Sequence, residues 1–172
     1  MEKKKITKLF FAWQDENEQT WLEQMAAHGW ILEEVGFIRY TFRKEKPRHI
    51  NYRLDYQELK ESELQSYLEL FADAGWEYIG RLNNWFYFAS SGPDTREIYT
   101  DVHSKIQKYK RVLRSLIFAC IPISYLLIFF PRFTGQATFS DILLFMVFLM
   151  ALMVVFNIIR LALRVNKMEK GL

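Results

Sequence analysis

A pattern of apolar and polar positions occurs twice in the chain, shifted by 46 residues: residues 21–30 read WLEQMAAHGW and residues 67–76 read YLELFADAGW. In both copies the apolar residues recur at three- and four-residue spacing, which is typical of one face of an α-helix. Glycine takes the left-handed conformation without a Cβ clash, so Gly29 and Gly75 are expected to end the two helices. Trp30 and Trp76 then turn back over the last helical turn as core residues.

Short segments rich in β-branched and aromatic residues flank each predicted helix. They cover residues 6–13, 31–35 and 38–43 around the first helix, and residues 49–56, 78–81 and 85–89 around the second. Each copy therefore reads strand–helix–strand–strand. Because neither copy can bury its own apolar face, we expect an α+β fold in which the two copies form one antiparallel sheet of about six strands, with both helices on one face.

Two apolar segments follow this duplicated domain, which covers residues 1–92. Residues 115–131 and 142–159 carry no charged side chain, and each approaches the ~20 residues that a helix needs to cross a membrane. We expect a hairpin of two transmembrane helices. Its predicted parts are a basic juxtamembrane helix at 93–111, a first span at 112–131, an external loop at 132–141, a second span at 142–160 and a basic tail at 161–172.

The basic residues near the spans predict their orientation. Five precede the first span, namely Lys105, Lys108, Lys110, Arg111 and Arg114, and four follow the second, namely Arg160, Arg164, Lys167 and Lys170. The loop between the spans has Arg132 alone. Basic loops stay on the cytoplasmic side, so we expect a protein of the cell membrane with both termini in the cytoplasm. The first five basic residues are candidates for contact with lipid headgroups; a role in topology alone is the plainer alternative.

Charge divides the chain in the same way. Residues 1–92 hold 12 Lys and Arg against 15 Asp and Glu, whereas residues 93–172 hold 11 against 5. The basic excess flanks the apolar segments, which favours membrane topology over nucleic-acid binding. A single cysteine, Cys120, excludes an intramolecular disulfide and a cysteine metal cluster.

Residues with catalytic or metal-binding potential are scattered. His28, His49 and His103 fall in three different elements and have no carboxylate at a metal-ligand spacing. Asp15, Glu16 and Glu18 could serve general acid–base chemistry, but a capping box formed by Asp15 with Glu18 explains them more simply. The sequence has no glycine-rich phosphate loop and no nucleophile elbow. We therefore expect a protein that is not an enzyme and that holds no cofactor or metal.

Strand alternation predicts one surface of interest. If the apolar and aromatic residues at 40, 42, 50, 52, 54, 56, 86 and 88 face the helices, the opposite face of the sheet carries Arg39, Arg43, Arg53, Asp55, Trp85 and Tyr87. Arginine beside tryptophan and tyrosine is typical of protein-binding surfaces. A solvated sheet face with cross-strand ion pairs is the alternative. RNA recognition on such a sheet is disfavoured by the acidic balance and the membrane segments.

Several segments together resemble a family of uncharacterised proteins from Gram-positive bacteria. They are the helix that ends Gly29-Trp30, the strand YRLDY at 52–56, the phrase LFADAGWEY at 70–78 and the aromatic strand WFYF at 85–88. The resemblance covers about residues 5–92. It implies a domain of unknown function, a C-terminal pair of membrane spans and an association with PadR-type transcriptional repressors, and it implies no catalytic residues.

These expectations favour a membrane-anchored, non-enzymatic regulatory or sensory protein whose cytoplasmic domain binds a protein partner or a small ligand. The alternative is an accessory subunit of a membrane or transport complex that acts through its spans. The sequence does not identify the partner or ligand. It leaves the oligomeric state open, since an exposed aromatic sheet face is compatible with a homo-oligomer.

Overall fold

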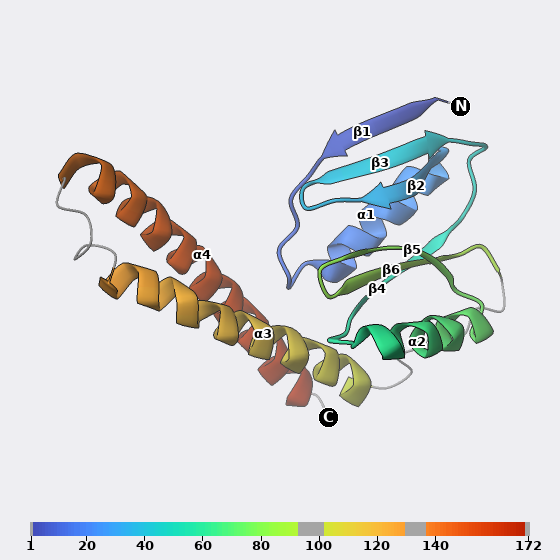
Figure 1. The fold of residues 1–172 in the computed structure, drawn as a ribbon. Coiled ribbons are helices and arrows are strands. Elements are labelled where there is room, and N and C mark those ends of the chain that lie inside the picture. The colour runs from blue at the N-terminus through green and yellow to red at the C-terminus, as the bar shows by residue number, and fades with distance from the viewer. Residues whose placement is uncertain (1, 93–101, 130–136, 171–172) are drawn as a thin grey trace. The chain divides into compact units, whose positions relative to one another are not determined.

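The structure is a computed structural model that describes residues 2–92, 102–129 and 137–170, with the backbone alone for residues 126–129 and 137–143. The chain folds as two units, Met1–Lys108 and Tyr109–Leu172. The N-terminal unit contains six strands and two helices, followed by the start of a third helix (Figure 1). Their order is β1 (Lys3–Thr7), α1 (Asp15–Ala27), β2 (Trp30–Val35), β3 (Arg39–Lys44), β4 (Asn51–Tyr56), α2 (Glu61–Asp73), β5 (Glu77–Leu82) and β6 (Trp85–Ser90).

The predicted duplication is confirmed. Both halves follow the order strand–helix–strand–strand, and α1 shifted by 46 residues has the bounds of α2. The aromatic packing repeats as well. The Trp21 ring lies 5.0 Å from the Tyr40 ring in the first half, and the Tyr67 ring lies 4.9 Å from the Phe86 ring at the equivalent positions of the second.

The strands form two sheets, so the prediction of one six-stranded sheet is wrong. The strand orders are β1-β3-β2 and β4-β6-β5, both antiparallel. The edge strands β2 and β5 lie side by side, with a Val35 methyl 3.6 Å from the place that a Cβ on Gly80 would occupy. Each of these strands carries a bulge, at Leu32/Glu34 and at Tyr78/Gly80. A bulge increases local twist and interrupts regular pairing, which explains why the two edges approach without forming a ladder.

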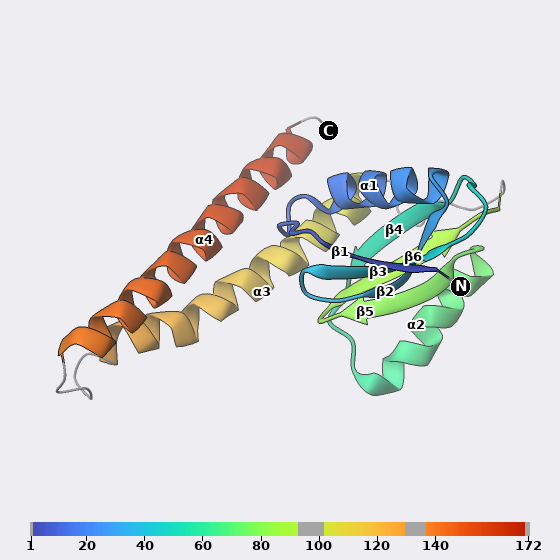
Figure 2. The ribbon, with the colours of Figure 1, turned by 90° about the horizontal axis from the view of Figure 1, so that it is seen from above.

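The two helices also cover different faces, contrary to the prediction (Figures 1 and 2). In the second sheet, Leu54 lies opposite Tyr87 and Asp55 lies opposite Phe86. The face with Leu54 and Tyr87 joins the core around α1. The face with Phe86 and Phe88 packs under α2, where the Phe71 ring stacks 3.8 Å from that of Phe88. Helix α1 therefore packs against the first sheet and against one face of the second, and its Leu22 and Ala26 are fully buried.

Glycine ends both helices as predicted: φ is +80° at Gly29 and +86° at Gly75. Trp76 is buried, as expected of a core residue. Trp30 is only half-buried, and its ring is approached by the ammonium groups of Lys4 and Lys44 at 5.3 and 4.5 Å. The glycine therefore ends the helix in both halves, whereas the tryptophan that follows it is buried in the core only in the second half.

The C-terminal unit contains most of α3 (Val102–Phe129) and all of α4 (Ala137–Glu169). Helix α3 runs without a break from the basic segment into the apolar one. Residues 93–101 of the predicted juxtamembrane helix lie outside the described residues. The two helices pack together through the Arg164 guanidinium, 4.6 Å from the Tyr109 ring centroid, and through an ion pair of 2.8 Å between Lys110 and Glu169.

One described helical segment is long and apolar enough to cross a membrane, namely Leu144–Glu169 within α4, and most of it is exposed. Length and composition therefore support a single membrane anchor near the predicted second span. The described part of α3 does not meet the same criterion, and the predicted first span at 112–131 extends beyond it.

Candidate functional site

A buried carboxylate lies at the meeting point of the two halves. Glu18 belongs to the first turn of α1 and is 6% exposed. The predicted capping box of Asp15 with Glu18 does not form, because α1 begins at Asp15 and neither side chain caps it. The Glu18 side chain extends instead toward the sheets.

Two tyrosine hydroxyls, one from each sheet, donate hydrogen bonds to the same oxygen of this carboxylate. Tyr40 Oη from β3 is 2.7 Å from Glu18 Oε1, and Tyr87 Oη from β6 is 2.8 Å from it. Hydrogen bonds to a charged group each contribute about 1.5–3 kcal/mol. The carboxylate therefore links the first sheet to the second.

The electrostatics follow from burial. Desolvation raises the pKa of the Glu18 carboxyl above its usual range, the hydrogen bonds from Tyr40 and Tyr87 oppose this rise, and the charge of Asp15 adds to it. Burial, followed by the nearby Glu18 charge, also raises the pKa of both tyrosines. Their hydroxyls consequently remain protonated donors throughout the physiological range.

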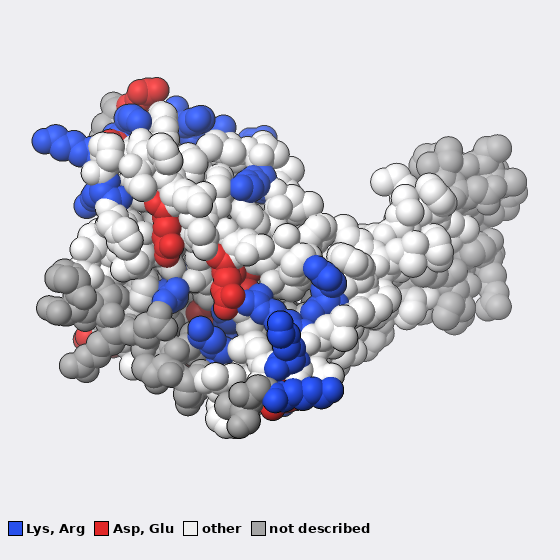
Figure 3. Space-filling view, turned by 180° about the vertical axis from the view of Figure 1, so that it is seen from behind, with Lys and Arg blue, Asp and Glu red and all other residues white. Residues whose placement is uncertain are grey.

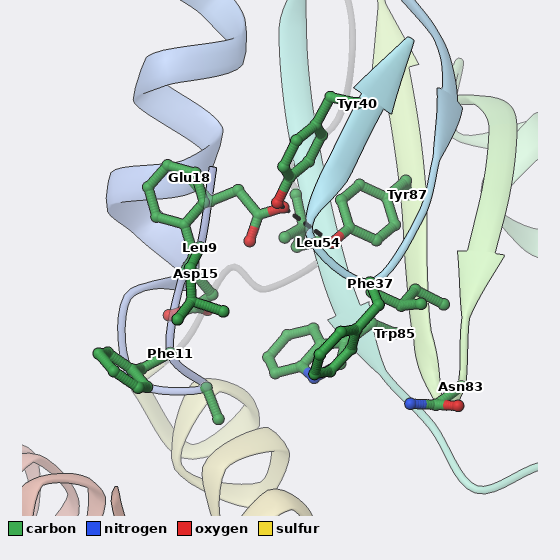
Figure 4. A pocket seen from close by; sticks show the side chains of 13 residues that line it. Leu9, Phe11, Asp15, Glu18, Phe37, Tyr40, Leu54, Asn83, Trp85 and Tyr87 are labelled. Carbon is green, nitrogen blue, oxygen red and sulfur yellow. Dashed lines mark hydrogen bonds between the residues drawn. The ribbon is translucent and has the colours of Figure 1, made fainter. Parts of the chain in front are cut away.

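Beside this cluster is a cavity of about 180 Å³, which we call the Glu18 cavity (Figure 4). It lies where the loop before α1, the β2–β3 turn and the β5–β6 hairpin meet. Its lining residues are Leu9, Phe10, Phe11, Ala12, Asp15, Glu18, Phe37, Tyr40, Leu54, Leu82, Asn83, Trp85 and Tyr87. Leu9 and Phe37 are 52% and 74% exposed, so apolar side chains form its rim.

The second oxygen of Glu18 is available to a ligand. Both hydrogen bonds of the carboxylate within the described residues use Oε1. In Figure 4 the other oxygen, Oε2, points away from the two tyrosines and into the cavity. A buried acceptor of this kind, surrounded by aromatic rings, is the usual polar feature that orients a ligand in an apolar pocket.

The other carboxylate that lines the cavity is already neutralised. Asp15 is 2% exposed, and its Oδ2 accepts a hydrogen bond of 2.6 Å from Lys108 Nζ. Lys108 is itself buried, although the sequence suggested a role at lipid headgroups. Of the other residues predicted for that role, Lys105 and Arg111 are half-buried and Lys110 and Arg114 are exposed.

The six residues predicted to form a partner-binding face do not share one surface. Arg53 and Asp55 project from the face of the second sheet that α2 covers. Asp55 accepts a hydrogen bond of 2.7 Å from Tyr67 Oη. The Arg53 guanidinium lies 5.7 Å from the Trp76 ring centroid and also donates a hydrogen bond of 3.0 Å to Gln19 Oε1 of α1. Trp85 and Tyr87 lie on the opposite face and line the Glu18 cavity. This correction follows from the register of β4 and β6, which the alternation of one strand does not determine.

The two remaining residues belong to the first sheet. Arg39 is exposed, and Arg43 forms an ion pair of 2.6 Å with Glu45.

On the face seen from behind in Figure 3, acidic side chains lie between basic ones and uncharged surface surrounds both. Among the described residues, no group of three His, Cys, Asp or Glu side chains could hold a metal ion.

Sequence reasoning missed Glu18 and Tyr40 as a pair, although the repeat contains a signal for them. Shifted by 46 positions, Glu18 corresponds to Leu64 and Tyr40 to Phe86. Leu64 and Phe86 belong to the apolar core under α2. A polar pair that replaces an apolar pair at equivalent interior positions indicates a specialised site in the first half.

The N-terminal unit is thus a duplicated α+β domain with a ligand-sized cavity between its halves, in a chain that also has a helix long enough to span a membrane. The chain belongs to the family described as Protein of unknown function (DUF2812), which matches residues 14–121. That match includes Glu18, Tyr40 and Tyr87. Comparisons with curated proteins and with solved structures gave no match.

The raised pKa of Glu18 predicts how stability changes with pH. A carboxyl whose pKa is higher in the folded state than its unfolded value of 4.5 stabilises the fold below about pH 4.5, and this contribution is lost as the pH rises through the folded pKa. Glu18→Gln keeps the shape and removes the charge. We expect the urea midpoint of the variant, relative to the wild type, to increase between pH 4 and pH 8.

Tryptophan fluorescence of the full chain in maltoside micelles measures this midpoint, because all five tryptophans lie between residues 13 and 85. The titratable and charged groups that face Glu18 are Tyr40, Tyr87 and the Asp15–Lys108 pair. Glu16→Gln, at an exposed position of the same helix, is the control. An equal pH dependence in both variants would contradict the prediction.

Proposed function

We propose that this chain is a membrane-anchored, non-enzymatic regulatory or sensory protein whose cytoplasmic domain binds a small ligand in the Glu18 cavity. The observation that carries the proposal is the buried Glu18 carboxylate with one oxygen directed into an aromatic cavity. The two tyrosines beside it have raised pKa values and act as fixed donors, which suits a binding site better than proton transfer.

The membrane part of the proposal rests on α4 and on the sequence. We propose two spans, with the second in α4 and both termini in the cytoplasm. Basic residues precede the first apolar segment and follow the second, whereas the loop between the two segments has Arg132 alone. The protein partner that we propose for the regulatory role is a PadR-type regulator, as the sequence resemblance implies. The ligand, rather than a protein, is the proposed occupant of the cavity, because a volume of about 180 Å³ suits a small molecule.

An accessory subunit of a membrane complex is the second candidate. It is favoured by the many exposed apolar side chains of α4, among them Phe145, Met146 and Leu152, which a partner helix could cover as well as lipid could. Under this alternative the cavity would have no part in the function.

A fragment screen tests the proposed function. The full chain is recovered from membranes washed with alkaline carbonate, which retain anchored proteins, and is transferred to maltoside micelles. Neutral, cationic and anionic fragments of up to ~10 non-hydrogen atoms are then tested by ligand-observed NMR. We expect some of them to bind, and to be lost in Ala12→Phe, because Ala12 lines the cavity and the added ring would fill it.

The matched control for this screen is Ala72→Phe at an exposed position of α2, which should bind as the wild type does. If no fragment of any charge binds, or if Ala12→Phe binds them all unchanged, the Glu18 cavity is not a ligand site. If the full chain leaves the membranes in the carbonate wash, the proposed anchoring is wrong.

A further inference from the structure

We infer that the Glu18 cavity binds a small organic cation of the methylated ammonium class. This inference rests on the proposed function of the cavity as a ligand site and specifies the chemistry of its ligand. Six aromatic rings line the cavity, those of Phe10, Phe11, Phe37, Tyr40, Trp85 and Tyr87. They come from four separate segments of the fold, namely the loop before α1, the β2–β3 turn, β3 and β6.

The charges around the cavity favour a cation. Aromatic faces attract positive charge through their quadrupoles, and the attraction increases when the cation is desolvated. Asp15 is neutralised by Lys108, which leaves the Glu18 carboxylate as the charge directed into the cavity. No Lys or Arg is among the described lining residues. Two cations lie near the lining. Lys108 Nζ pairs with Asp15 and lies 3.4 Å from Leu54 O. Lys8 Nζ is 4.9 Å from the Phe10 ring centroid, so Phe10 contributes less than the other rings.

The hydrogen-bonding groups decide between a methylated ammonium and a primary one. Glu18 Oε1 already accepts two hydrogen bonds, and the Tyr40 and Tyr87 hydrogens are directed to it. Oε2 is then the acceptor that Glu18 offers to a ligand. A primary ammonium has three donors. Asn83, the amide in the lining, is exposed, so a primary ammonium beside Glu18 would depend on the Tyr40 and Tyr87 oxygens for its remaining acceptors. Methyl groups on nitrogen need no acceptors and can contact the aromatic faces directly.

Size agrees with this class. Benzene fills an apolar cavity of ~150 Å³ in an engineered protein, and the Glu18 cavity measures about 180 Å³. A trimethylammonium group is of comparable size. The exposed rim residues Leu9 and Phe37 leave room for a short substituent on the nitrogen to reach solvent.

A comparison of choline with its neutral isostere tests the inference. Choline chloride and 3,3-dimethylbutan-1-ol have nearly the same shape and differ in charge. Each is titrated into the full chain in maltoside micelles at constant ionic strength and followed by calorimetry, since maltosides carry no ammonium group. We expect choline to bind at least about tenfold more tightly than the isostere.

Variants separate the contribution of the carboxylate from that of the aromatic rings. Glu18→Gln should weaken choline binding about tenfold or more and leave the isostere unchanged, whereas Glu16→Gln should alter neither. Trp85→Leu should weaken choline more than the isostere, and tryptophan fluorescence at neutral pH checks that each variant is folded.

Equal binding of choline and the isostere by the wild type would overturn the inference without the use of any variant. So would choline binding that Glu18→Gln leaves unchanged. If neutral or anionic fragments bind the cavity and choline does not, the ligand class is wrong while the proposed ligand site stands. If no fragment of any charge binds, both proposals are wrong.

Discussion

Replacing Lys108 by methionine will lower the free energy of unfolding of the N-terminal unit by about 3 kcal/mol or more. Lys108 Nζ lies 2.6 Å from Asp15 Oδ2, and the two side chains are 5% and 1% exposed. Removing the ammonium deprives the buried Asp15 carboxylate of its ion-pair partner. The loss of a partner costs more than the pair contributes, because the desolvation of the remaining carboxylate is no longer offset.

Urea unfolding followed by tryptophan fluorescence measures this effect in the full chain. Lys110→Met is the matched control, because the Lys110–Glu169 pair has the same chemistry on the same helix with side chains 49% and 44% exposed. Exposed pairs contribute at most about 1 kcal/mol. The double variant Asp15→Asn with Lys108→Met should recover part of the loss. Equal effects of Lys108→Met and Lys110→Met would show that the buried pair does not stabilise the unit.

Gly29→Ala is expected to destabilise the same unit by about 3 kcal/mol, and Gly75→Ala by about 1–2 kcal/mol. Both residues have positive φ, at +80° and +86°, and both substitutions introduce backbone strain. At Gly29 a Cβ would also lie 2.6 Å from the backbone oxygen of Glu45. That segment cannot easily move away, because Glu45 N donates a hydrogen bond of 2.9 Å to Gly29 O.

The two glycines occupy equivalent positions of the repeat, so each is the control for the other. Unfolding in urea should give a larger loss for Gly29→Ala, and the difference between the variants isolates the steric contribution from the strain that they share. Equal losses would mean that the chain around Glu45 adjusts freely.

Local features of the fold could be predicted from the sequence because their causes are local. The ends of the helices at Gly29 and Gly75 follow from the conformations open to glycine, and the presence of α1 and α2 follows from helical periodicity. The division into two sheets could not be predicted in this way. It depends on bulges in β2 and β5, and a bulge reflects how a strand meets its partner rather than its own pattern.

The candidate site was hidden for a related reason. Asp15 and Glu18 at the start of a helix fit a capping box, and nothing in their neighbourhood along the chain indicates burial. Their partners are Lys108, Tyr40 and Tyr87, which lie 22 to 93 positions away. The sequence predicts that Phe86 and Tyr87 of β6 point to opposite faces, and this is correct. Which of the two faces α1 depends on the register of β6 with β4, and that register places Tyr87 rather than Phe86 beside α1.

The approach of β2 to β5 without a ladder has a mechanical consequence for the N-terminal unit. Within the described strands, each backbone ladder stays inside one half of the repeat, and side chains such as Glu18 join the halves. Moving one half against the other would therefore break no strand-to-strand hydrogen bond. The two halves are held at this boundary by the shared apolar core around α1 and by the Glu18–Tyr87 hydrogen bond. A displacement of one half against the other is therefore opposed by side-chain packing and not by a strand ladder.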